Sequence, residues 1–495
     1  MTGEVGVSKQ RSWIKIGLNG TFQPNGAQTS SAADLDALFK EPMGDPARLL
    51  LHIHGGLVPE TAGVSIADAM MAHYDGTTRS IGLVWKTGLL ETIRGNLAQI
   101  GNTRSFKKAL SWVLTKALSE LADDPAARGA AQAKLTQPAI EAQLGTSAGV
   151  KALDKQLVAA VDSDPDLVRS KGGGRAATDE ALEETLALEL QGDVTDLQIL
   201  VDEESDRFAK SLDQAIRTES EAEGLSGSRG LSFTVARLLA KTILAVIRRY
   251  RNGTHHDLLP TAVEELLRAA HLAKIGVFAW GEMKEKAEAM WHDDGDTPGP
   301  TGHVGGYILR KLEKLQKDNP DTVIDLVGHS AGSIVICAML RAIAAQGRKI
   351  RFRNILFLAP AVRLDTFCRD LAPPAPGGPF QRFRMFTMTD EAEKADKLVG
   401  AIYPRSLLFL VSGLFEDRPG TALAGMARHI AMRTPPAGDG FDAVRQWLDQ
   451  NSRLVLSPTK PGSGSGLQTE ARRHGDFDND KPTLASLLHL AGIKP

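Results

Sequence analysis

Short runs of apolar residues recur along the chain, and several are continuous rather than alternating with polar residues. Continuous apolar runs are typical of strands in a parallel sheet, because helices cover both faces of such a sheet. Segments with helical periodicity lie between many of these runs, and this order indicates an α/β fold. The pattern predicts a mostly parallel central sheet of about eight strands flanked by helices, at Trp13–Leu18, Leu49–His54, Ile81–Trp85, Ile275–Trp280, Val323–Val327, Ile355–Leu358, Phe383–Met388 and Leu407–Val411.

The amino-acid composition changes between about Gly88 and Leu272. Ala, Leu, Glu, Asp, Gln and Lys dominate this stretch and strand-forming residues are few, which favours helices. We therefore predict an α/β core made of residues 1–87 and 273–495, interrupted by a large helical insertion at 88–272. The insertion is a candidate cap or interaction domain.

Composition narrows the class of protein. With 42% hydrophobic and 24% charged residues, the 495-residue chain is expected to fold around a large core. The 58 Lys and Arg against 60 Asp and Glu give a net charge of −2, so no overall field favours nucleic acid. Two cysteines are too few for a disulfide framework, and no signal peptide or membrane span is evident. We expect a soluble, cytoplasmic protein.

A G-x-S-x-G motif occurs twice, around Ser147 and around Ser330. The motif is short enough to arise by chance, so its surroundings decide its meaning. Ser147 follows a helix-like polar mixture and is interpreted as part of a turn between helices. Ser330 instead follows the apolar run Val323–Val327 and precedes the apolar run Ser333–Leu340, which predicts a strand, a sharp turn and a buried helix.

This strand–turn–helix with the sequence Gly-His-Ser-Ala-Gly resembles the nucleophile elbow of the alpha/beta-hydrolase superfamily, and the motif is typical of its lipases and esterases. The resemblance implies that Ser330 is a nucleophile on a strained turn. It also implies that Gly328 and Gly332 let the helix and strand approach closely. The backbone N–H of Ala331, at the start of the helix, would be one donor of an oxyanion hole.

The second oxyanion donor is expected early in the chain. The run Leu49–Leu57 is an apolar strand that ends in His54-Gly55-Gly56. It resembles the His-Gly-Gly oxyanion loop of hydrolases, which implies that Gly56 or Leu57 supplies a backbone N–H opposite that of Ala331.

Histidines elsewhere are weighed as metal ligands. His52 and His54 lie on the same strand face, but two histidines make only half of a zinc site, and no further ligand is evident nearby. A structural role for His54, hydrogen-bonded to its loop, is the better interpretation. His255–Asp257 and His292–Asp294 are interpreted as solvated turns, and no metal or cofactor is required.

The general base must follow the nucleophile, because the superfamily order is Ser, acid, His. Only His429, His474 and His489 follow Ser330. His429 and His489 lie in apparent helices. His474 lies in a polar loop before the last helix, where the resemblance places the catalytic histidine.

Three carboxylates are candidates for the acid that orients this histidine. Asp390 ends the second predicted strand after the elbow helix, which matches the usual position in the superfamily. Asp365 and Glu416 are rivals that follow other predicted strands. Asp390 could also cap a helix beginning at Glu391, and the two roles are compatible.

Together these residues predict a serine hydrolase that cleaves a carboxylic ester through an acyl-enzyme, with Ser330, His474 and Asp390 as the triad. The substrate is a small-molecule or lipid ester. Phe233–Ile247, followed by Arg248–Arg251, could contact a membrane surface, but burial within the insertion is favoured. Two alternatives stay open: an acyltransferase or peptidase with the same triad, and a catalytically silent scaffold that binds a protein through the insertion.

Overall fold

The structure is a computed structural model of the 495-residue chain. It describes residues 12–25, 29–40, 47–56, 60–74, 78–85, 90–121, 135–162, 179–191, 206–223, 228–296, 298–374, 377–399, 402–431 and 440–493.

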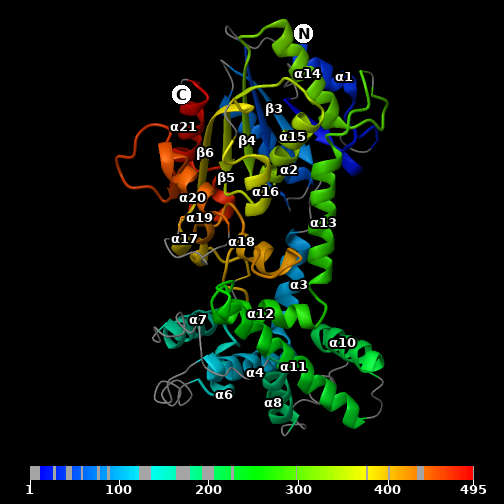
Figure 1. Ribbon diagram of the computed structural model, residues 1–495, viewed down its shortest axis with the longest axis vertical. Helices are drawn as coiled ribbons and strands as arrows, with labels where there is room; N and C mark the ends of the chain where they lie inside the picture. The colour runs from blue at the N-terminus through cyan, green and yellow to red at the C-terminus, as the bar shows by residue number, and fades with distance from the viewer. Residues whose placement is uncertain are drawn as a thin grey trace, which may run out of the picture. The chain divides into compact units, whose positions relative to one another are not determined.

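Within the described residues, seven parallel strands form one sheet in the order β1-β3-β2-β4-β5-β6-β7. Figure 1 shows its central strands β3, β4, β5 and β6. The predicted α/β class with a parallel sheet is therefore confirmed. The strands are β1 (Trp13–Ile16), β2 (Arg48–Ile53), β3 (Arg79–Trp85), β4 (Val323–His329), β5 (Phe352–Leu358), β6 (Phe380–Met388) and β7 (Leu454–Ser457).

Two predicted strands are wrong and one strand was missed. Ile275–Trp280 lies inside helix α13 (Lys274–Ala289), and Leu407–Val411 lies in helix α18 (Leu407–Leu410) and the start of a π-helical turn. A short apolar run fits a buried helix as well as a strand, so periodicity alone could not separate them. β7 was not predicted because its four residues are too few to show a clear alternation of apolar and polar positions.

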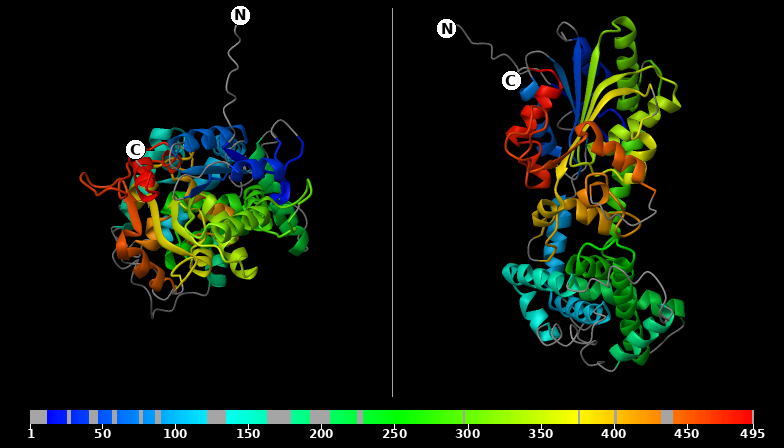
Figure 2. Two further views of the ribbon diagram at one scale, coloured as in Figure 1. Left: turned by 90° about the horizontal axis from the view of Figure 1, so that it is seen from above. Right: turned by 60° about the vertical axis from the view of Figure 1, so that its left-hand side comes forward.

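Helices cover the sheet on both sides (Figure 2). α2 (Glu60–Tyr74) and α21 (Lys481–Leu490) share a buried cluster with the sheet that includes Met70, Tyr74 and Leu487. α15 (Gly332–Ala345) packs on β4 and β2. The remaining helices around the sheet are α1 (Ala32–Lys40), α14 (Val304–Asp318), α16 (Leu364–Asp370), α17 (Asp390–Ala395), α19 (Ala427–Ile430) and α20 (Asp442–Asp449).

The chain divides into two compact units. Unit 1 contains the sheet and comprises residues 1–90, 281–393 and 422–495. Unit 2 comprises 91–280 together with 394–421, so a second segment joins the helical region expected at 88–272. Its helices, besides α18 and the first part of α13, which continues into unit 1 from Gly281, are α3 (Leu90–Asn102), α4 (Arg104–Leu121), α6 (Gln137–Gln143), α7 (Ser147–Asp162), α8 (Asp179–Gln191), α10 (Arg207–Glu223), α11 (Ser228–Arg251) and α12 (Leu258–Ala269).

Buried ion pairs attach the second segment of unit 2 to the first. Glu264 accepts hydrogen bonds from Tyr403 and from Arg249, the latter at 2.5 Å. Its carboxylate also lies 2.8 Å from Nδ1 of His256. The interpretation of His255–Asp257 as a solvated turn is wrong for His256 and Asp257. His256 is buried in this network, and Asp257 is buried against Arg405 of the second segment, 2.7 Å away.

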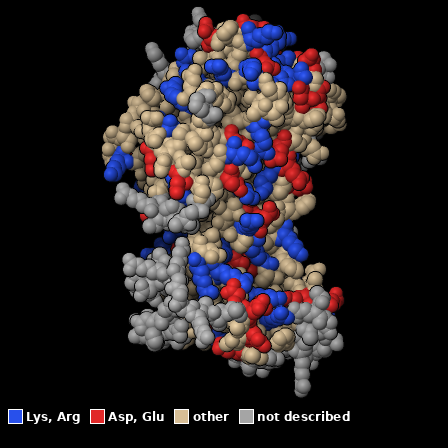
Figure 3. Space-filling view, in the orientation of Figure 1, with Lys and Arg blue, Asp and Glu red and all other residues tan. Residues whose placement is uncertain are grey.

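The apolar stripe of α11 is buried within unit 2, including Val235, Leu239 and Ile243. In the part of the chain that the structure describes, no helix is both long and apolar enough to cross a membrane. Acidic and basic side chains are intermixed on the face shown in Figure 3, in keeping with the small net charge.

Candidate active site

Ser330 occupies the turn between β4 and α15 and has a φ angle of 51°. This left-handed conformation is strained for a residue other than glycine and persists only where the surroundings hold it. The Ser330 N–H donates to the Leu358 carbonyl at 2.8 Å, and the Ser330 carbonyl accepts from the Ala361 N–H at 3.0 Å. Neighbouring backbone from the β5 side therefore fixes the turn.

Both glycines of the motif are needed for close packing. A Cβ at Gly332 would lie 2.3 Å from the Ile53 carbonyl oxygen, and one at Gly328 would lie 2.8 Å from Cδ1 of Ile336. Larger residues would push α15 away from β2 and β4 and would displace the serine between them.

His474 begins a short 3-10 turn (His474–Asp476) that follows β7. Its Nε2 lies 2.8 Å from Oγ of Ser330, although 144 residues separate the two in sequence. Burial and, to a smaller extent, the charge of His329 together lower the pKa of His474 to about 3, whereas Asp478 opposes the shift. The ring is therefore neutral near pH 7 and can accept the serine proton.

Asp390 lies at the start of α17, just beyond β6. Its carboxylate forms a two-pronged ion pair with Arg428, at 2.8 Å and 3.2 Å. The charges that act on the His474 ring are instead those of His329 and Asp478. The role of Asp390 as the acid that orients His474 thus stays a prediction.

The two rival carboxylates have other partners. Asp365 pairs with Arg363 at 3.0 Å, and Glu416, in unit 2, accepts a hydrogen bond from Nε1 of Trp280 at 2.6 Å.

A second histidine–carboxylate pair lies beside His474. Nδ1 of His329 is 2.8 Å from Oδ2 of Asp478, and its Nε2 is 3.1 Å from the His474 carbonyl. A carbonyl can only accept, so Nε2 is the donor. Burial alone would lower the pKa of His329, but the charge of Asp478 and these hydrogen bonds raise it overall. The Asp478 carboxylate therefore favours the positive form of the His329 ring, and the His329 Nε2–H holds the backbone of His474.

Sequence reasoning missed this pair, although both members lie in motifs that it examined. His329 is the variable residue of the Gly-His-Ser-Ala-Gly motif, and Asp478 lies four residues after His474. The signal was a carboxylate close in sequence to the predicted base. A fixed Ser–acid–His order directed attention away from it.

The His-Gly-Gly loop runs directly against the elbow. A Cβ at Gly55 would lie 3.2 Å from Cβ of Ser330, and one at Gly56 would lie 2.7 Å from Cβ of Ala331. The structure therefore brings Gly56 and Ala331 together. Leu57 lies outside the described residues.

His54 holds this loop, which confirms its expected structural role. Its Nδ1–H donates to the Gly55 carbonyl at 2.6 Å, and its Nε2 accepts from the Trp85 N–H at 3.2 Å. Burial lowers the pKa values of His54 and His52 to about 4, so both rings are neutral near pH 7. Within the described ranges, no group of three His, Cys, Asp or Glu is arranged to hold a metal ion.

Ser147, in the other G-x-S-x-G motif, is exposed at the first turn of α7 in unit 2. It does not share the setting of Ser330, which lies buried between a strand and a helix.

The parallel sheet flanked by helices, with a serine on a strained turn between strand and helix, has the architecture of the alpha/beta-hydrolase superfamily. Residues 308–403, which contain β4, the elbow and β6, match the model of a family described as "Alpha/beta hydrolase of unknown function (DUF900)". No curated protein and no solved structure matches the chain.

Proposed function

We propose that the protein is a serine hydrolase that cleaves a carboxylic ester, with Ser330 as nucleophile and His474 as general base. The observation that carries the proposal is the 2.8 Å contact between Oγ of Ser330 and Nε2 of a neutral, buried imidazole. This contact joins a nucleophile and a base at hydrogen-bond distance, as acyl transfer requires.

In the proposed reaction, Oγ of Ser330 attacks the acyl carbon while its proton passes to Nε2 of His474. The oxyanion accepts hydrogen bonds from the backbone N–H groups of Gly56 and Ala331, where loss of one donor costs about 2.7–4 kcal/mol. His474 then protonates the departing alcohol, leaving an acyl-enzyme. Water attacks this ester, gives its proton to His474 and releases the acid and Ser330.

We further propose that Asp478 is the carboxylate that supports His474, acting through His329 rather than by direct contact. The support is geometric. His329 connects Asp478 to the His474 backbone through contacts of 2.8 Å and 3.1 Å. Asp478 also favours the positive form of His474, which develops in the transition state. Asp390 is the alternative, because its place after β6 matches the superfamily.

The substrate class within carboxylic esters is also a proposal. A lipid acyl ester fits the lipase-type motif, and transfer of the acyl group to an alcohol or amine would use the same residues. Chromogenic esters of increasing chain length, presented as monomers and as micelles, would identify the preferred acyl group. Faster product formation on an added amine than on water would identify a transferase.

A fluorophosphonate probe tests the nucleophile directly, because it labels an activated serine covalently. The wild-type protein should be labelled, Ser330→Ala should not be labelled, and Ser147→Ala should be labelled as fast as wild type. Labelling that persists in Ser330→Ala would overturn the proposal. A wild-type protein that is folded but never labelled would favour a silent scaffold.

A further inference from the structure

The first half of β6 has a strand neighbour on only one side. β5 pairs with β6 from Phe380 onwards, whereas β7 pairs with it only from Met385 to Met388. Within the described chain, Phe380–Arg384 therefore presents a free strand edge. The Met385 N–H donates to the Arg453 carbonyl on the β7 side. Because alternate residues of a regular strand face the same side, the backbone groups of Phe383 also face the open side. The Phe352 N–H donates to the Pro379 carbonyl on the β5 side, so this alternation does not extend back to Gln381.

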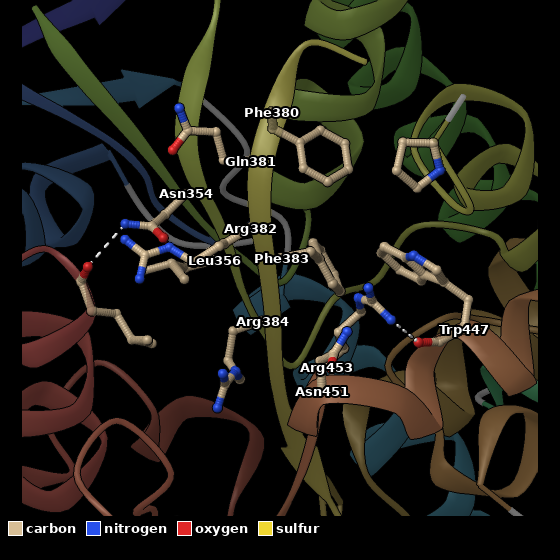
Figure 4. A pocket seen from close by; sticks show the side chains of 12 residues that line it. Asn354, Leu356, Phe380, Gln381, Arg382, Phe383, Arg384, Trp447, Asn451 and Arg453 are labelled. Carbon is tan, nitrogen blue, oxygen red and sulfur yellow. Dashed lines mark hydrogen bonds between the residues drawn. The ribbon is translucent and has the colours of Figure 1, made fainter. Parts of the chain in front are cut away.

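A cavity of about 350 Å³ follows this free edge. Its walls come from both faces of the sheet (Figure 4). Arg382 and Arg384 lie on one side of β6, whereas Phe383 and Trp447 lie on the other. The two aromatic rings pack together with their centroids 5.2 Å apart. One side therefore carries two arginines. The other is aromatic, with the Arg453 guanidinium stacked 4.6 Å from the centroid of the Trp447 ring.

The positive charge of the cavity is not balanced by its own walls. Arg382, Arg384 and Arg453 line it, and none of the described lining residues is Asp or Glu. Burial and the nearby charge of Arg382 lower the pKa of Arg384, and burial lowers that of Arg453. Nε of Arg384 is buried and has no hydrogen-bond partner among the described residues. An anionic ligand would relieve this excess.

We propose that the free edge of β6 binds an extended peptide in which acidic and apolar side chains alternate. Successive side chains of a strand point to opposite faces. Such a peptide would therefore direct its carboxylates towards Arg382 and Arg384 and its apolar groups towards Phe383 and Trp447. Its backbone would pair with that of Phe383 at the open edge, which is recognition by strand addition.

Charge and shape select this occupant over two others. A second copy of the chain pairing through the same edge would bring arginines opposite arginines, which is destabilising. A small anion could contact the basic side or the aromatic side, but it has no backbone to pair with the strand edge.

The binding test uses a labelled eight-residue peptide alternating Glu and Val, with fluorescence anisotropy as the readout. A matched peptide with Lys in place of Glu should bind at least about tenfold more weakly. Two further peptides carry N-methyl groups on alternate residues. One is methylated at the odd-numbered residues and the other at the even-numbered residues. Strand addition uses the N–H groups of one edge only, so one methylated peptide should lose binding and the other should keep it.

Variants connect the binding to this edge. Arg382→Gln with Arg384→Gln should weaken binding about tenfold or more. Arg217→Gln, which breaks an exposed pair with Asp213 in unit 2, should not change it. Arg382→Glu with Arg384→Glu should transfer the preference to the Lys peptide. Circular dichroism and fluorophosphonate labelling check that each variant remains folded and active.

Three results would overturn the proposal. The wild-type protein could bind none of the peptides, in which case the arginines only protect an exposed strand edge. The two methylated peptides could bind equally, or inorganic phosphate could displace the Glu peptide completely, and either result would mean a simple anion site.

Discussion

Each unit buries a cluster of charged groups, and the two clusters differ in what they contain. In unit 2, the Glu264 carboxylate contacts Arg249 and His256 and also accepts from Tyr403. Although burial opposes its ionisation, the charges of His256 and Arg249 lower the pKa of Glu264 to about 2. This cluster is balanced, and it connects two chain segments.

The cluster in unit 1 also contains a pair of opposite charge, His329 and Asp478, but this pair lies beside two groups that could react with a substrate. Ser330 is held in a strained conformation, and His474 is held neutral beside it. Buried charge alone therefore does not identify a functional site, since ion-pair networks that serve structure also shift pKa values. A serine in a strained conformation that contacts a neutral imidazole distinguishes the catalytic candidate from the structural cluster.

The largest expected effect is a loss of stability when the cluster in unit 2 is disrupted. Glu264→Gln removes one buried charge and leaves Arg249 paired with Glu265, which lies 3.0 Å away. Breaking a buried ion pair in this way should lower the free energy of unfolding of unit 2 by about 3–5 kcal/mol. Hydrogen exchange of amides in α11 and α12 would measure the loss.

The matched control is Glu189→Gln, which breaks an exposed pair with Lys116 and should cost less than about 1 kcal/mol. Under conditions where Glu264→Gln remains folded, its Ser330 should react with fluorophosphonate at the wild-type rate. A lost labelling rate in this folded variant would contradict the division into one structural and one catalytic cluster.

A smaller effect is expected when the His329–Asp478 pair in unit 1 is disrupted, and it is a change in the rate at which Ser330 is labelled. Asp478→Asn removes the charge that keeps His329 protonated, so the loop carrying His474 is held less firmly. Labelling of Ser330 should slow by about tenfold to a hundredfold, the range expected for a misplaced catalytic group. The labelling rate should also decline as pH rises, because His329 loses its proton. In Asp478→Asn this decline should begin at a lower pH than in the wild-type protein.

Asp390→Asn is the matched comparison, since it leaves an isosteric partner for Arg428. We expect its labelling rate and its pH profile to stay close to those of wild type. The reverse outcome, with Asp390→Asn slow and Asp478→Asn normal, would restore the acid that the sequence pattern favours.

These expectations also mark how far the sequence alone leads. The elbow was predictable because its signals are local: an apolar strand, two glycines around a serine and an apolar helix. His474 was predictable by elimination, because only three histidines follow Ser330. The contact between these two residues, across 144 positions, depends on a shared chain order rather than on any local pattern.

The parts that escaped prediction depend on packing. Leu407–Val411 looks like a strand, but tertiary contacts fold it into helix within unit 2. The buried role of His256 depends on Glu264, eight positions away, and on Tyr403 from a distant segment. Likewise, nothing in the motif around Ser330 reveals that His329 pairs with Asp478, because that pairing exists only after the last loop folds back.

A third expected effect is a change in how stability depends on pH, and it involves His52. Burial lowers the pKa of His52 to about 4, whereas an unfolded histidine titrates near 6.5. Between these values the unfolded state binds more protons, so stability falls as pH falls, by about 1.4 kcal/mol per pH unit. Replacing His52 with Gln should remove this contribution, measured by urea unfolding at about pH 6.5 and about pH 4.5.

The pKa of His329 is shifted in the opposite direction from that of His52, so His329 serves as the comparison. Its raised pKa means that its contribution to stability is complete below the unfolded value and is lost as pH rises through the folded value. His329→Gln should therefore flatten the alkaline side of the stability profile, whereas His52→Gln flattens the acidic side. If both variants flattened the same side, the site could not contain one neutral and one charged buried histidine, and the proposed support of His474 would fail with it.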